Sequence, residues 1–84
     1  MPTPEIIERV RLLRTQLAEA EPAAPEFDPV ASHIDAVLAE PAHASRYEGL
    51  RDRLRAASAS IESRHPQLAA SMNAVINALG AAGV

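Results

Sequence analysis

Three histidines are the side chains of this sequence best suited to acid–base or metal chemistry. His33 is expected within a helix, His43 in a connection and His65 directly before a proline. Asp35 is two residues from His33, about 200° around a helix, so these two side chains cannot hold one ion. We therefore predict no metal site, a solvated His43, and a His65 ring that bonds a free backbone group at a helix end.

Carboxylates and serines also lack the neighbours that catalysis requires. Glu48 and Asp52 share one face of a helix. Arg51 and Arg55 flank them, which is typical of a solvated face of mixed charge. No serine has a histidine at the spacing of a nucleophile and its base, and the three glycines form no phosphate-binding loop. We predict no catalytic residue, no cofactor and no enzymatic activity.

Charge and composition narrow the classes of partner further. The net charge is −3, and all eight basic residues are arginines. The segment 46–64 holds five of them beside three acidic residues, and the chain has only one tyrosine and one phenylalanine for base stacking. We interpret these arginines as charges that flank a helical seam, and we predict no nucleic-acid partner. The absence of cysteine excludes disulfides and thiolate ligands.

Helical signals begin near the start of the chain. Thr3 can cap a helix whose first residue is Pro4. An apolar stripe follows, whose residues are four, three and four positions apart. These signals predict a helix over 4–20. Prolines then predict a connection over 21–28. Asp28 repeats the cap before a proline, so a second helix is predicted over 29–39. The first stripe consists of Ile6, Val10, Leu13 and Leu17.

The second half of the chain predicts two more helices separated by a proline. Ser45 and Glu48 form a capping box at the start of a helix over 46–64, whose narrow apolar seam is of the coiled-coil type. Pro66 ends or kinks this helix, and a fourth helix is predicted over 67–79. No segment has the alternating pattern of a strand. We therefore predict one all-α domain over 1–84, a small oligomeric bundle of about four helices.

Two segments near the end of the sequence, IESRHPQLAA (61–70) and ALGAAGV (78–84), resemble a small bacterial family known only as domain of unknown function 4404. Its members share a C-terminal pattern that begins with an aromatic residue and Glu, continues after one variable residue with Ser-His-Pro, and reaches Leu after one more. A Gly-Ile pair follows near the end. Here Ile61 replaces the aromatic residue, and Arg64 stands where a serine is expected, so it cannot supply a short hydroxyl cap. The resemblance implies an all-helical fold and no assigned activity.

Residues 65–84 contain no Asp, Glu, Lys or Arg. An apolar stripe lies on one side of the expected helix and an alanine ladder on the other, more contact surface than a small monomer can bury. We expect a non-enzymatic interaction protein that forms a homodimer, with an unknown protein as a further possible partner. The predicted interface lies in the third and fourth helices and comprises Leu50, Leu54, Ala57, Ile61, Leu68, Ala70, Met72, Ala74, Val75, Ala78 and Leu79.

The alternative reading is a peripheral membrane protein that uses residues 66–84. Membrane-surface helices favour Lys or Arg on the polar face and bulky aromatic residues on the other, whereas this segment offers Asn, Gln and Ser. Membrane contact is therefore the less favoured expectation. No signal peptide and no apolar run long enough to span a bilayer are visible, so we expect a cytoplasmic protein.

Overall fold

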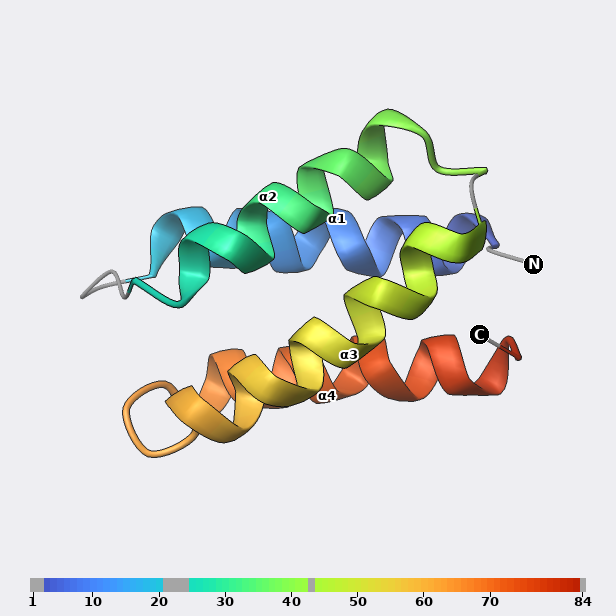
Figure 1. Cartoon of the computed structure of the whole chain (residues 1–84). Coiled ribbons are helices and arrows are strands. Elements are labelled where there is room, and N and C mark those ends of the chain that lie inside the picture. Colours follow the sequence, from blue (N-terminus) through green and yellow to red (C-terminus); the bar gives the residue numbers. More distant parts are fainter. Residues whose placement is uncertain (1–2, 21–24, 43, 84) are drawn as a thin grey trace.

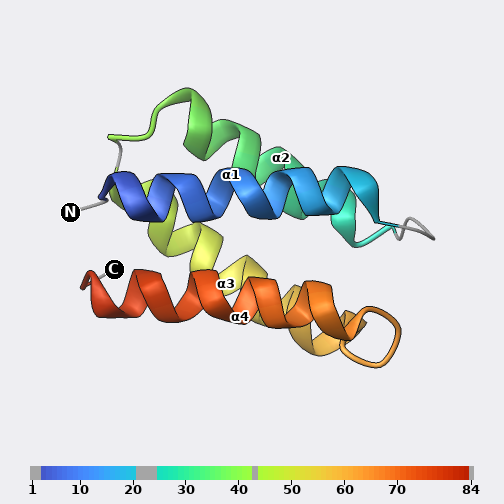
Figure 2. The same ribbon diagram turned by 180° about the vertical axis from the view of Figure 1, so that it is seen from behind.

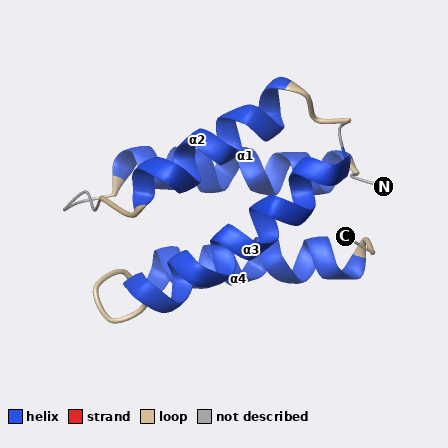
Figure 3. Cartoon of the chain, viewed as in Figure 1, coloured by secondary structure: helices blue, strands red, loops and turns tan. Residues whose placement is uncertain are grey.

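The computed structural model describes residues 3–20, 25–42 and 44–83. These residues form four helices and no strand, which confirms the predicted all-helical bundle (Figure 3). The helices are α1 (Pro4–Glu19), α2 (Phe27–Ala39), α3 (Ala44–Ile61) and α4 (Pro66–Ala81).

The four helices form a ring in which the chain runs up and down. α1 and α2 make one layer, and α3 and α4 make the other (Figure 1). α1 packs against α2 and α4, and α3 packs against the same two helices, so α1 and α3 lie diagonally opposite. The start of α1 and the end of α4 lie at the same end of the bundle, as both views show (Figures 1 and 2).

One apolar stripe from each helix faces the centre of this ring. The stripes that the spacing predicts on α1 and α3 are both buried, and α2 and α4 each add their own. Tyr47 is fully buried and is the largest such side chain. The principal buried side chains are Ile6, Val10, Leu13, Leu17, Phe27, Val30, Ile34, Val37, Tyr47, Leu50, Leu54, Ile61, Leu68, Met72, Val75, Ile76 and Leu79.

The two N-terminal helices begin differently from each other. At α1 the predicted cap is confirmed, because the N–H of Ile6 donates to Thr3 Oγ1 at 3.3 Å. α2 begins at Phe27 and not at residue 29, so Asp28 is not its cap. The Phe27 ring is buried, and Pro29 is tolerated in the first turn because its missing N–H would have no helical partner there. Residues 21–24 of the predicted connection lie outside the described residues.

α3 and α4 are separate helices. α3 begins one residue before Ser45, which therefore lies in the first turn and not at the cap, and it ends at Ile61, three residues earlier than predicted. The carbonyl of Ile61 accepts the N–H groups of both Arg64 and His65, at 2.9 and 2.7 Å, which closes the turn. Pro66 then occupies the first position of α4, where its fixed φ suits a helix.

Replacing Leu54 by alanine tests whether the α3 seam belongs to the core of one chain. Leu54 is fully buried, so Leu54→Ala should lower the free energy of unfolding by about 2–5 kcal/mol, a large part of the roughly 4–13 kcal/mol expected for a domain of this length. Urea denaturation at several protein concentrations measures this change in the free energy of unfolding. The loss should be the same at every concentration; a loss confined to high concentration would place Leu54 in an interface between copies.

Candidate functional site

The residues predicted to form an interface divide into two groups in the structure. Ala70 and Ala74 are exposed and Ala78 is half-buried. The others are buried in the core of the single chain, so their side chains cannot reach a second molecule while the bundle is closed. These buried residues are Leu50, Leu54, Ala57, Ile61, Leu68, Met72, Val75 and Leu79.

α4 therefore presents to solvent a face that differs from the apolar stripe. The helix contains no Asp, Glu, Lys or Arg anywhere along its sixteen residues. At the border with α3, the hydroxyl of Ser58 donates to Asn73 Oδ1 at 3.4 Å. Apart from Pro66 in the first position, the exposed side chains are alanines and amides, which we call the outer face of α4: Gln67, Ala70, Asn73, Ala74, Asn77 and Ala81.

Two hollows lie along the seam between α1 and α4, one at each end. The first is walled on the α4 side mainly by alanines, among them Ala74, Ala78 and Ala81, and on the α1 side by residues that include Ile6 and Arg9. We call it the alanine hollow. The second, which we call the polar hollow for its five polar residues, is lined by Gln16, Glu19, His65, Gln67 and Ser71 together with Ala20, Pro66 and Leu68. A third hollow lies on α1 alone and is lined by Glu5, Glu8, Arg9, Arg11 and Leu12. The seam is thus the surface between two helices where unfilled space remains.

Leu12 is a surface residue that the sequence analysis missed. Its side chain is 59% exposed, the one large hydrophobic residue so exposed in the part of the chain that the structure describes. The signal was present, because Leu12 stands outside the spacing of the apolar stripe that Leu13 continues. Leu12 therefore gives α1 an apolar patch on a second side, away from the core.

His33 belongs to a cluster of hydrogen bonds that joins α2 to α3. Its Nε2 lies 3.0 Å from the carbonyl oxygen of Arg46, which can only accept, so Nε2 carries the proton. Arg46 in turn donates through Nη1 to the carbonyl of Ala36 at 3.2 Å and through Nη2 to Glu40 Oε1 at 3.4 Å. His33 and Arg46 therefore position the two helices.

Tyr47 completes this corner from the buried side. Its hydroxyl donates to the carbonyl of Pro41 at 2.7 Å, which ties the turn after α2 to the first turns of α3. Burial raises the pKa of Tyr47, because the phenolate would lose its hydration in the core. The phenol is thus held as a hydrogen-bond donor.

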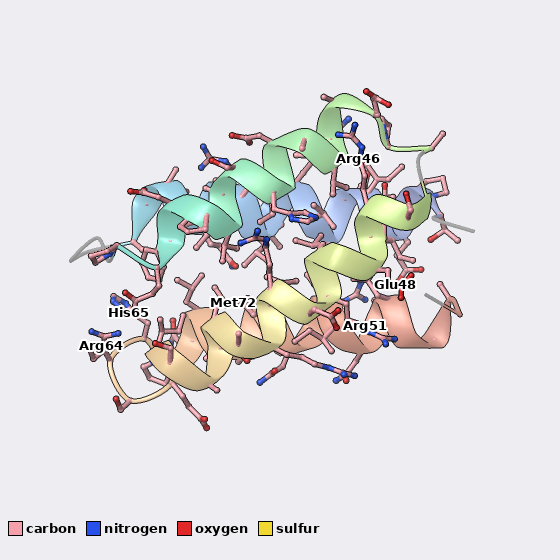
Figure 4. The ribbon with its side chains drawn as sticks, in the orientation of Figure 1. Arg46, Glu48, Arg51, Arg64, His65 and Met72 are labelled. Carbon is pink, nitrogen blue, oxygen red and sulfur yellow. The ribbon has the colours of Figure 1, made fainter. Side chains whose placement is uncertain are left out.

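His65 and Arg64 lie at the opposite end of the bundle from Arg46 (Figure 4). The prediction that the His65 ring bonds a backbone group is wrong, because no side chain caps α4 and the ring instead packs edge-on against Phe27, with centroids 5.3 Å apart. Arg64 forms an ion pair with Glu26. The pKa of Glu26 is lowered, first by a hydrogen bond from its own backbone N–H and then by Arg64. Both side chains thus join the α3–α4 turn to the start of α2.

The described histidines are not brought together. His33 lies at the α2–α3 corner and His65 at the other end, and His43 is outside the described residues. In the described part of the chain, no group of three or more His, Cys, Asp or Glu side chains could hold a metal ion. Nor does that part include a helix with the length and apolar character needed to cross a membrane.

A titration of the single tyrosine tests the buried corner. The phenolate of Tyr47 should form at a pH above the ordinary tyrosine value of about 10 in the folded protein, and near that value in denaturant. Because the unfolded chain then loses its proton first, stability should fall as the pH rises above about 10. Ultraviolet absorbance reads this one side chain, since the chain has no tryptophan and no second tyrosine. A Tyr47→Phe variant should lose about 1 kcal/mol at neutral pH and show no such alkaline decline.

Gly49 provides a second test of the same corner. A Cβ placed there would lie 3.0 Å from Cε1 of His33, so the ring would have to shift by a few tenths of an ångström, which strains its bond to Arg46. An alanine also favours a helix by about 1 kcal/mol over glycine. The two effects separate in a double-mutant cycle: Gly49→Ala should be more favourable in a His33→Ala background than in the natural chain, by about 1 kcal/mol. Equal effects of Gly49→Ala in both backgrounds would show that the ring is not held against position 49.

Comparison with known proteins identifies a family and adds no activity. No curated protein and no solved structure matches the chain. One family does match, described as a domain of unknown function, DUF4404, and the match extends over residues 6–84. Because that match covers nearly the whole chain, the chain belongs to the DUF4404 family.

Proposed function

We propose that this protein is a non-enzymatic cytoplasmic interaction module that associates with a second copy of itself through the outer face of α4. The observation that carries the proposal is the lack of charge on that face. An exposed helix surface ordinarily carries Glu, Lys or Arg, as the outer sides of α1 and α3 do here with Glu8, Arg11, Asp52 and Arg53.

The side chains of the outer face of α4 suit close packing between helices. Ala70 and Ala74 are four residues apart on one side of the helix, and half-buried Ala78 continues their line. Small residues at this spacing let another helix approach more closely than the usual 8–10 Å between axes. The amides of Asn73 and Asn77 beside them can donate and accept hydrogen bonds at the edge of such a contact.

Self-association in this form differs from the arrangement expected from the sequence. The apolar residues of α3 stabilise the single chain, so the proposed contact uses α4 and leaves the α3 seam in the core. The proposal does not extend to membranes, because the apolar side chains of α4 that would enter a lipid surface are buried as well. It includes no catalysis, in keeping with the structural contacts of His33 and His65.

Light scattering coupled to size exclusion tests the proposal with a matched pair of variants. The natural chain should run as a dimer, and Ala74→Glu should shift it to a monomer, because two glutamates would be buried without partners at a two-fold contact. Ala18→Glu, on an exposed site of α1, should leave the dimer intact. Thermal melts should show that both variants fold. A natural chain that is monomeric at all concentrations, or a dimeric Ala74→Glu variant, would contradict the proposal.

A further inference from the structure

The outer face of α4 is too narrow to form a stable interface alone. A helix of sixteen residues is about 24 Å long and about 10 Å wide, which gives a face of roughly 240 Å². A stable interface takes about 800 Å² from each partner, about a sixth of the 4886 Å² surface of this chain. A helix beside α4 must therefore contribute to the contact.

Of the two helices beside α4, α1 offers the more suitable surface. Ser58, which bonds Asn73, marks the border of α3, and exposed Arg55 lies three residues earlier on the same strip. Covering that border would remove the Arg55 guanidinium from water, which costs free energy unless the contact supplies a carboxylate. The border of α1 instead adjoins the two hollows and carries exposed Leu12.

Leu12 lies on the strip of α1 that forms the seam. Arg9 lines the alanine hollow and Gln16 lines the polar hollow, and Leu12 stands three residues after the first and four before the second. Residues at these spacings follow one another along one side of a helix. An exposed apolar side chain thus sits between the two hollows, at the edge of the seam, where it also borders Glu8 and Arg11 on the outer side of α1.

The alanine hollow is the one that matches a leucine side chain. Ala74, Ala78 and Ala81 supply methyl groups on the α4 side, and Ile6 lies on the α1 side. The ion pair between Arg9 and Glu5, 3.2 Å apart, forms the rim and adds no net charge. The polar hollow contains Glu19 and His65, which a leucine could cover only by removing them from water.

We infer that a second copy of this chain packs antiparallel across the α1–α4 seam, with Leu12 of each copy inserted into the alanine hollow of the other. A two-fold interface uses the same surface on both partners, so a projecting side chain and its receiving hollow must lie on one face, as they do here. When the two copies run antiparallel, Leu12 of one copy lies opposite the alanine hollow of the other, which is near the start of α1. The inference rests on the proposed self-association and adds the helix and the side chain that complete the interface.

Substitution of Leu12 tests the inserted side chain. Leu12→Gln removes two apolar side chains from each dimer and should weaken dimerisation at least about tenfold, measured as a dissociation constant by analytical ultracentrifugation. Because Leu12 is exposed in the single chain, the melting of the monomer should not change. Ala18→Gln, at an exposed site on α1, is the matched control and should leave the constant unchanged.

Cross-linking tests the position of Leu12 in the partner. The chain has no cysteine, so Leu12→Cys and Ala78→Cys can be made as two single variants and mixed. Under mild oxidation the mixture should yield a disulfide between the two variants, whereas a mixture of Ala18→Cys with Ala78→Cys should not.

The outcomes separate this inference from the function on which it rests. A natural chain that stays monomeric overturns both. A second outcome is a dimer that Ala74→Glu breaks and Leu12→Gln leaves unchanged, with no disulfide between Leu12→Cys and Ala78→Cys. This outcome supports self-association through α4 and overturns the insertion of Leu12 into the alanine hollow of the partner. Weakening by Leu12→Gln together with the specific disulfide supports both.

Discussion

Helices in a folded protein gain most of their stability from packing of an apolar face, so each of the four helices in this chain depends on the apolar stripes of its two neighbours. The ring arrangement lets all four stripes meet at one centre while each helix keeps its opposite side for solvent. This requirement determines which residues remain available for other molecules. The largest apolar side chains of α3 and α4 are used within the chain, and what α4 has left to offer is small and uncharged.

The two ends of the bundle are held by different kinds of contact. At the α2–α3 corner, His33, Arg46 and Tyr47 satisfy backbone carbonyls of the turn and of the neighbouring helix. At the other end, an ion pair between Glu26 and Arg64 and the ring contact of Phe27 with His65 join α2 to the α3–α4 turn. The ion pair is exposed and contributes little to stability. The Tyr47 hydroxyl is buried, so if its hydrogen bond to the carbonyl of Pro41 were lost, water could not take its place. The corner is therefore the firmer of the two attachments.

Much of this fold is predictable from local signals. The stripe from Ile6 to Leu17, the Thr3 cap and the break at Pro66 depend on spacing and on backbone chemistry, which act within a few residues. The start of α2 cannot be predicted in this way, because the ring of Phe27 packs in a core that distant segments build. The site is less predictable still. Periodicity shows which side of a helix is apolar, but it does not show whether that side packs within one chain, as Leu54 does, or against a second molecule.

The close approach of α2 and α3 also constrains how this sequence can evolve. Position 49 has no side chain, and the His33 ring occupies the space that a Cβ would need. A side chain at position 49 requires the His33 ring to shift by a few tenths of an ångström, against its hydrogen bond to the carbonyl of Arg46. The crossing thus couples positions 33 and 49, which are sixteen residues apart in the chain, because an imidazole at one and a Cβ at the other need the same space.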